Sequence, residues 1–140
     1  MKDRIKDKLK DLMQYIQEFD NIIPSSFEEY KNTKEKAACE RYVEKIMEAA
    51  VDIVFLIIKY LRKQIPDDDQ SAFDIMAGLG IISPKTAIAM KSAKGMKNII
   101  SHQYNKIDDE IVFDAITNEL LIDAKSFAKE IENWILKNSP

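Results

Sequence analysis

Cysteine and histidine are almost absent from this 140-residue chain, which has one of each, Cys39 and His102. A single cysteine excludes an internal disulfide and any cysteine-rich zinc site. A single histidine excludes the paired histidines of the common zinc hydrolases. Because the carboxylates also lack the spacing of a ligand set, we expect neither a metal site nor a cofactor.

Glycine and proline are scarce as well, with 3 and 4 residues, so the sequence has little turn chemistry. Long stretches rich in Glu, Lys, Ala, Ile and Leu with so few breakers favour an all-α protein. The most apolar run, residues 53–58, is far too short to span a bilayer. The charged amphipathic pattern that follows Met1 is unlike a signal peptide. We therefore expect a cytoplasmic protein without a membrane segment, with residues 1–140 forming one domain.

Apolar residues recur at steps of three and four along four long segments, which is the spacing of one buried helix face. These segments run from about Ile5 to Pro24, from 34 to 63, from Pro84 to about Ser101, and from Asp108 to the C-terminus. A short helix is predicted over 71–77, and one further turn over 27–31. Residues suited to helix N-caps precede the later segments: Asn32 or Thr33, Asp67–Asp69, Ser83 and Asp108-Asp109. The pattern predicts an antiparallel up-and-down helical bundle of four long helices and one short helix.

The segment 34–63 has apolar residues over more than half of its helical circumference. A helix with so wide an apolar face is either central in its own bundle or packs against a partner chain. The segment that follows Pro84 adds small residues, Ala89, Ala93 and Gly95, which allow close approach. These two faces together predict a homodimer with a two-fold interface.

Positive charge is concentrated in residues 83–107, although the whole chain has a formal net charge of -3. This segment contains five lysines (85, 91, 94, 97 and 106), the only histidine and no acidic residue. A local basic patch on an acidic body suits a small anionic site better than a long nucleic-acid duplex. A solvated lysine face is the alternative interpretation of the same pattern.

One stretch inside this basic segment contains the candidate site residues: Gly95-Met96-Lys97-Asn98-Ile99-Ile100-Ser101-His102-Gln103-Tyr104. It combines a lysine, a histidine and a tyrosine within eight residues, and histidine is the side chain best suited to proton transfer near neutral pH. In a continuous helix, His102 would project about 140° around the axis from Lys97. A turn ending near Ser101 would instead bring the imidazole back toward the lysine, and the spacing alone allows both arrangements.

The same stretch resembles the signature of HEPN domains, and specifically of HepT-like minimal toxins, whose pattern is Arg-Asn-x3-His-x-Tyr. Lys97-Asn98, His102 and Tyr104 match it in register, with lysine in place of arginine. Residues 41–53 resemble the long second helix of that family, and residues 72–82 resemble the short helix and turn that follow it. The similarity therefore covers nearly the whole chain and implies an HEPN-like helical bundle.

This resemblance implies a ribonuclease toxin of a type VII-style toxin–antitoxin pair, in which two subunits contribute to one metal-independent site. RNA supplies its own nucleophile, the 2′-hydroxyl, so such a site needs an acid/base and a positive charge for the developing phosphorane. Carried onto this chain, His102 would be the acid/base and Lys97 the electrostatic stabiliser. Tyr104 would be the residue to which a partner, the minimal nucleotidyltransferase antitoxin, attaches AMP.

Three further residues have supporting roles in this hypothesis. Asn98 precedes His102 by one helical turn and is expected to position the imidazole or a phosphate. Glu48 and Asp52 belong to a line of acids along the second helix. One interpretation is a solvent-facing acidic stripe, and the other is that Glu48 or Asp52 meets Lys97 or His102 across the bundle.

Two other functions remain open for the same residues. Guanidinium holds two phosphate oxygens through a planar fork, whereas an ammonium is a hydrated point charge. The lysine at position 97 is therefore also consistent with a non-catalytic HEPN dimer that binds a nucleotide or its partner. The third alternative is a plain helical assembly scaffold, in which the basic groove is closed in the dimer.

Overall fold

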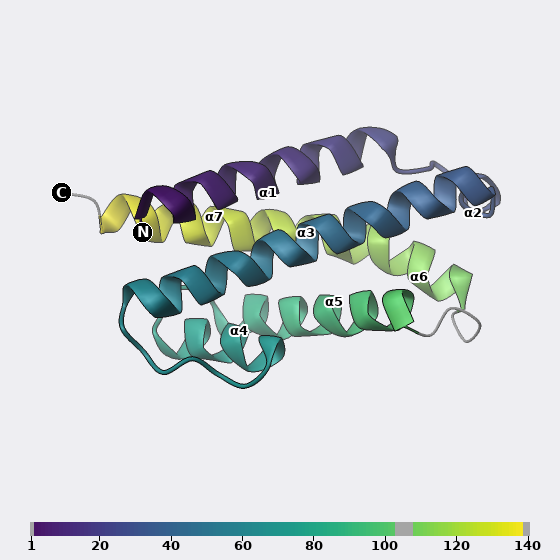
Figure 1. Ribbon diagram of the computed structural model, residues 1–140. Coiled ribbons are helices and arrows are strands. Elements are labelled where there is room, and N and C mark those ends of the chain that lie inside the picture. The colour runs from purple at the N-terminus through teal and green to yellow at the C-terminus, as the bar shows by residue number, and fades with distance from the viewer. Residues whose placement is uncertain (1, 103–107, 139–140) are drawn as a thin grey trace.

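The computed structural model describes residues 2–102 and 108–138, and every regular element in these ranges is a helix. In chain order the elements are α1 (Lys2–Ile22), α2 (Phe27–Tyr30), α3 (Thr33–Tyr60), α4 (Asp69–Gly78), α5 (Pro84–His102), α6 (Asp109–Ala115), the π-helical segment η2 (Ile116–Leu120) and α7 (Leu121–Lys137). The long helices alternate in direction, so α1 begins and α7 ends at the same end of the bundle (Figure 1). The predicted all-α antiparallel bundle is confirmed. None of these described helices has the length and apolarity needed to cross a membrane.

Helix α1 packs along α3 through one apolar stripe. Its buried residues recur at steps of four and three: Ile5, Leu9, Leu12, Ile16 and Phe19. Each such side chain contributes about 1.5–3 kcal/mol when it is removed from water. The ring of Phe19 stacks on Tyr42 of α3 with 5.7 Å between centroids, and the Tyr42 hydroxyl donates a 3.0 Å hydrogen bond to Glu18. Helix α1 ends before Pro24, as the sequence predicts.

Helix α3 is the central element of the bundle. Asn32 caps its N-terminus by accepting a hydrogen bond from the Lys34 backbone N–H. Its buried residues cover a broad arc and include Ile46, Met47, Ile53 and Ile57, each 0% exposed. Helices α1, α4 and α5 cover that arc within one chain. Of the two alternatives for this apolar face, the central position in its own bundle is therefore the one that the structure shows, and the predicted homodimer would need another surface.

Helices α4 and α5 form an antiparallel pair beside α3 (Figure 1). Asp68 caps α4 by accepting a 2.7 Å hydrogen bond from the Ser71 backbone N–H. Hydrogen bonds from the Ser71 backbone and hydroxyl hold the pKa of Asp68 below its usual value. Helix α4 ends at a turn in which Gly80 has φ 73°, a left-handed conformation that favours glycine.

The N-terminus of α5 is anchored to α7 by a carboxylate. The Ser83 hydroxyl accepts a 3.1 Å hydrogen bond from the Thr86 backbone N–H, so Ser83 is the predicted N-cap and Pro84 the first helical residue. Glu130 of α7 accepts hydrogen bonds from the Ser83 backbone N–H and from the Thr86 hydroxyl. Thr86 is buried, with 6% of its surface exposed. This contact fixes where α5 begins relative to α7.

Replacing Glu130 with alanine is expected to lower the free energy of unfolding by about 1–3 kcal/mol, because the buried Thr86 hydroxyl and the Ser83 N–H lose their acceptor. Urea denaturation followed by circular dichroism measures the loss. Glu132→Ala is the matched control, since Glu132 is exposed on the same helix. Equal stability of the two variants would contradict the anchoring role of Glu130.

The last predicted helix is continuous but contains one irregular segment. Asp108 caps α6 by accepting hydrogen bonds from the Glu110 and Ile111 backbone N–H groups. The segment η2 then interrupts the α-helical pattern between α6 and α7. Within it the Thr117 hydroxyl donates a 2.7 Å hydrogen bond to the Phe113 carbonyl. A π-helical turn shifts the faces of the flanking helices relative to each other, so it changes which residues of this helix face α5.

Candidate functional site

Three of the predicted site residues, Lys97, Asn98 and His102, lie in the last turns of α5. Lys97 and Asn98 are half-buried, and His102 is exposed at the helix end. The buried residues Ala93 and Ile100 lie four before and three after Lys97, so the stem of Lys97 starts on the bundle-facing side of α5. A lysine stem can pack there while its ammonium reaches water.

The helix continues through His102, so the turn near Ser101 that would have brought the imidazole back toward Lys97 is absent. Five helical residues separate the two side chains by about 140° around the axis and about 7.5 Å along it. Within one chain Lys97 and His102 therefore project from different faces of α5. The helical backbone by itself therefore does not bring the two side chains together.

Two of the other described lysines in the basic segment form ion pairs within the chain. Lys91 forms an ion pair with Asp74 at 3.0 Å, and Lys94 forms one with Asp69 at 3.2 Å. Lys85 is close enough to Asp123 to lower its pKa, although burial is the larger effect and raises it. Lys97 has no carboxylate partner in residues 2–102 and 108–138. Among the described lysines of the segment, Lys97 and the exposed Lys85 form no ion pair, and of these two Lys97 lies near the C-terminal end of α5.

Asn98 is held by a neighbouring lysine. Its Oδ1 accepts a 3.0 Å hydrogen bond from Lys94 Nζ, one helical turn earlier on α5. The same ammonium is the one that pairs with Asp69 in the first turn of α4. Lys94 could not be identified as a site residue from the sequence pattern, because its partner Asp69 comes from another helix.

The two acids expected to support the site lie elsewhere. Asp52 forms an ion pair with Lys8 of α1 at 3.3 Å. It therefore does not meet Lys97 or His102, because its position on α3 faces α1. Glu48, four residues earlier on α3, is exposed and makes no ion pair with any described residue. The interpretation of these acids as a solvent-facing stripe fits their surroundings.

Tyr104 and Lys106, the remaining predicted or basic residues of this region, lie outside the described residues. The described chain resumes at Asp108, where α6 begins. An ion pair of 2.9 Å between Lys36 of α3 and Asp109 connects the start of α6 to α3. In the described ranges, no group of three or more His, Cys, Asp or Glu side chains is arranged to hold a metal ion.

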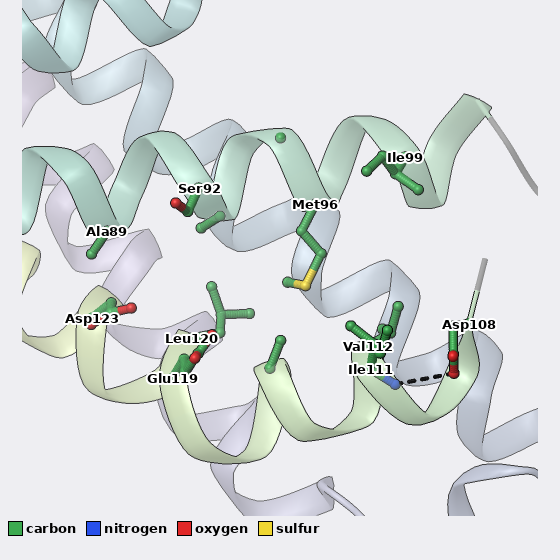
Figure 2. Close-up of a pocket in the computed structure, with 13 residues that line it drawn as sticks. Ala89, Ser92, Met96, Ile99, Asp108, Ile111, Val112, Glu119, Leu120 and Asp123 are labelled. Atoms are coloured by element: carbon green, nitrogen blue, oxygen red, sulfur yellow. Dashed lines mark hydrogen bonds between the residues drawn. The ribbon is translucent and has the colours of Figure 1, made fainter. Parts of the chain in front are cut away.

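A groove of about 840 Å³ runs between α5 and the opposing wall formed by α6, η2 and α7. We call it the α5–α6 groove. Figure 2 shows Met96 and Ile99 on α5 and Ile111, Val112 and Leu120 on the opposite wall. Its lining residues are Ala89, Ser92, Ala93, Gly95, Met96, Ile99, Asp108, Ile111, Val112, Ala115, Glu119, Leu120 and Asp123. The groove is thus apolar at its base, and it opens beside the C-terminal end of α5.

The two walls of the groove differ in charge. The α5 wall carries no acid, whereas the opposite wall carries Asp108, Glu119 and Asp123. Burial raises the pKa of Asp123, as expected for a carboxylate partly removed from water. Sequence periodicity did not reveal this wall, because η2 shifts the register between α6 and α7.

Large apolar side chains are exposed along the groove. Ile99 is 44% exposed and Ile111 is 67% exposed, and Ile88, at 66%, continues the same α5 stripe toward its N-terminus. On α5, Ile88, Ser92, Gly95 and Ile99 follow helical spacing on a single face. An exposed apolar stripe beside a groove is typical of a protein–protein contact.

The chain matches a ribonuclease family and two relatives whose names describe nucleases. Residues 12–131 match the family described as Ribonuclease HepT-like. A putative RNase of Archaeoglobus fulgidus is 30% identical over 94 residues, which is 67% of this chain and 70% of that protein. The tRNA nuclease HepT of Aphanizomenon flos-aquae is 27% identical over 106 residues, which is 75% of this chain and 70% of that protein.

A solved structure has the same fold. It is the tri-AMPylated HEPN toxin of Shewanella oneidensis in complex with its MNT antitoxin, with a TM-score of 0.86 and 20% identity. The superposition covers 95% of this chain and 99% of that one. Because the family match includes both the central helix α3 and the α5 motif, the chain belongs to the Ribonuclease HepT-like family.

Proposed function

We propose that this protein is an RNA endonuclease toxin in which Lys97 and His102 act on one phosphodiester. The observation that carries the proposal is the state of Lys97. In the described part of the basic segment, its charge has no carboxylate partner, and the exposed His102 follows at the same helix end. A cation without a carboxylate partner and an exposed imidazole at one helix end suit a phosphate ligand and proton transfer.

The reaction that fits this equipment is transesterification of RNA. The imidazole of His102 accepts the proton of the 2′-hydroxyl, whose oxygen attacks the adjacent phosphorus. The bond from phosphorus to the 5′-oxygen breaks, and that oxygen takes up the proton held by the imidazolium of His102 as it leaves. The ammonium of Lys97 stabilises the additional negative charge on the phosphorane oxygens. RNA brings the nucleophile, so the chain supplies only an acid/base and a cation.

The site is composed of two copies of the chain. Lys97 and His102 leave α5 about 140° apart, so Lys97 of one copy and His102 of the other meet at one phosphate more readily than both from the same helix. A two-fold axis near the C-terminal end of α5 generates two such pairs. The homodimer is therefore part of the proposed mechanism.

The α5–α6 groove is the surface on which the second copy packs. Its exposed isoleucines give an apolar centre, and three acids lie on the wall opposite α5, whose own lining residues are uncharged. In a two-fold dimer, α5 of each copy lies against the acidic wall of the other. This arrangement also brings His102 of both copies near the interface.

Ile111→Asp is expected to weaken the dimer at least about hundredfold, because the change enters a two-fold interface twice and places a charge in its apolar centre. Light scattering across a concentration series measures the dissociation constant. Leu136→Asp is the matched control, because Leu136 is 68% exposed on α7 and does not line the groove. A dimer that tolerates Ile111→Asp would place the interface on another surface.

Regulation is proposed to act on Tyr104, two residues after His102. The related Shewanella oneidensis toxin is described as tri-AMPylated and in complex with an MNT antitoxin. We propose that a minimal nucleotidyltransferase antitoxin attaches AMP to Tyr104 in the cytoplasm. The added phosphate would bring negative charge and bulk to the neighbourhood of His102 and so exclude RNA.

Incubation of the purified protein with tRNA in the presence of EDTA tests the proposed activity. Cleavage products that end in a 2′,3′-cyclic phosphate are the expected result, because the 2′-oxygen displaces the 5′-oxygen. Intact RNA after prolonged incubation at micromolar protein would reject the endonuclease. Cleavage that disappears with EDTA and returns with Mg²⁺ would reject the metal-independent mechanism.

A second candidate function is a non-catalytic dimer that binds a nucleotide or its antitoxin. The lysine at position 97 favours it, because an ammonium lacks the bidentate geometry of guanidinium. This candidate requires that Lys97→Arg gains no RNA cleavage and that the protein binds ATP or its partner while RNA remains intact. Cleavage by the natural sequence would reject it.

A further inference from the structure

Lys94 is largely enclosed although it is charged, with 12% of its side chain exposed. Its ammonium lies 3.2 Å from Asp69 Oδ2 and 3.0 Å from Asn98 Oδ1. The ammonium of Lys94 thus connects Asp69, in the first turn of α4, to Asn98, which precedes His102 by one helical turn.

The environment of Lys94 separates its role from that of Lys97. An ammonium removed from water is stabilised only if an acid and hydrogen-bond acceptors surround it, and Asp69 and Asn98 supply these. Its charge is compensated, so it adds little attraction for a phosphate. The contact through which Lys94 can act on the site is its hydrogen bond to Asn98.

The hydrogen bond from Lys94 fixes the orientation of the Asn98 amide. An ammonium only donates hydrogen bonds, whereas an asparagine amide has an accepting oxygen and a donating NH₂ group. A flipped amide would place the NH₂ group against the ammonium, so the oxygen must face Lys94. The NH₂ group then points away from Lys94, and no described residue accepts a hydrogen bond from it. His102 lies one turn further along the same helix.

We propose that Lys94, held by Asp69, is a positioning residue that keeps the NH₂ group of Asn98 directed at the RNA phosphate beside His102. The inference rests on the proposed ribonuclease function and adds one hydrogen-bond donor to it. Asn98 donates to a non-bridging phosphate oxygen, whose charge increases in the transition state. A donor that is oriented before RNA binds stabilises that charge without a reorganisation cost.

Lys94→Met removes the ammonium while keeping the length of the side chain. It is expected to lower kcat for RNA cleavage about ten- to hundredfold with little change in KM, since a misplaced donor costs rate more than binding. Lys91→Met is the matched control. Lys91 lies one turn before Lys94 on α5, pairs with Asp74 and does not touch Asn98. Lys94→Arg retains a donor and is expected to recover activity.

Non-additivity separates positioning from general loss of stability. Asn98→Ala alone should lower kcat as much as Lys94→Met, and the double variant should lose no more than either single variant. Asn98→Asp keeps an acceptor for Lys94 but has no NH₂ group, so it should remain folded and still lose activity. Full activity of folded Lys94→Met, or of Asn98→Asp, would overturn the proposal.

A spectroscopic measurement tests the orientation without reference to activity. The side-chain NH₂ signals of Asn98, identified by their absence in Asn98→Asp, are expected to shift in Lys94→Met and to stay unchanged in Lys91→Met. If the natural protein spares RNA, the proposed function fails while shifted signals still support positioning by Lys94. Unshifted signals overturn the inference whether or not RNA is cleaved.

Discussion

His102→Ala is expected to lower the rate of RNA cleavage about 100- to 10,000-fold, which is the contribution of a positioned general acid or base. The proposed site has one imidazole per copy, and no other histidine exists in the chain to replace it. Lys97 remains in the variant and still stabilises negative charge, so weak cleavage above the uncatalysed rate is expected. The measurement is the initial rate on a labelled RNA at enzyme concentrations above that of the substrate.

The fold and the dimer must be unchanged for this result to concern chemistry. His102 is exposed and makes no hydrogen bond with a described residue, so its removal should alter neither the thermal midpoint nor the mass in light scattering. Wild-type cleavage by a folded, dimeric His102→Ala variant would contradict the proposed acid/base.

The helices could be predicted because their signals are local. The stripe of Ile5, Leu9 and Leu12 and the caps at Asn32, Asp68 and Ser83 each depend on residues a few positions apart. The apolar spacing predicts which face of a helix is buried, and the cap residue often predicts where the helix begins. The second long helix was predicted to be either central or partner-facing, because its width alone does not identify what covers it.

The candidate site depends on contacts that sequence spacing does not contain. Asp52 and Asp69 are both acids on helix surfaces, yet Asp52 pairs with Lys8 of α1 and Asp69 with Lys94 of α5. These partners are set by the way the helices pack, as is the α5–α6 groove. The lone histidine and the lysine five residues before it were visible in the sequence. The structure was needed to show that Lys97 lacks a described carboxylate partner, whereas Lys91 and Lys94 each have one.

Hybrid dimers should show whether Lys97 and His102 act from different copies. Lys97→Ala and His102→Ala homodimers are each expected to be nearly inactive, because every site lacks one group. A hybrid of the two variants contains one site with both groups, taken from different chains, and one site with neither. It is therefore expected to have about half the wild-type rate. Co-expression with two affinity tags, followed by sequential purification, isolates this hybrid for a rate measurement.

The reciprocal hybrid gives the opposite result and serves as the matched control. It pairs a wild-type chain with a Lys97→Ala/His102→Ala chain, so each shared site lacks one of its two groups and the rate should be close to that of the single variants. A site formed within one chain predicts the reverse, with the reciprocal hybrid near half activity and the first hybrid inactive. The helix geometry favours the shared site, since continuation of α5 through His102 keeps the two side chains about 140° apart. Half activity in the reciprocal hybrid would require the last turn of α5 to open when RNA binds.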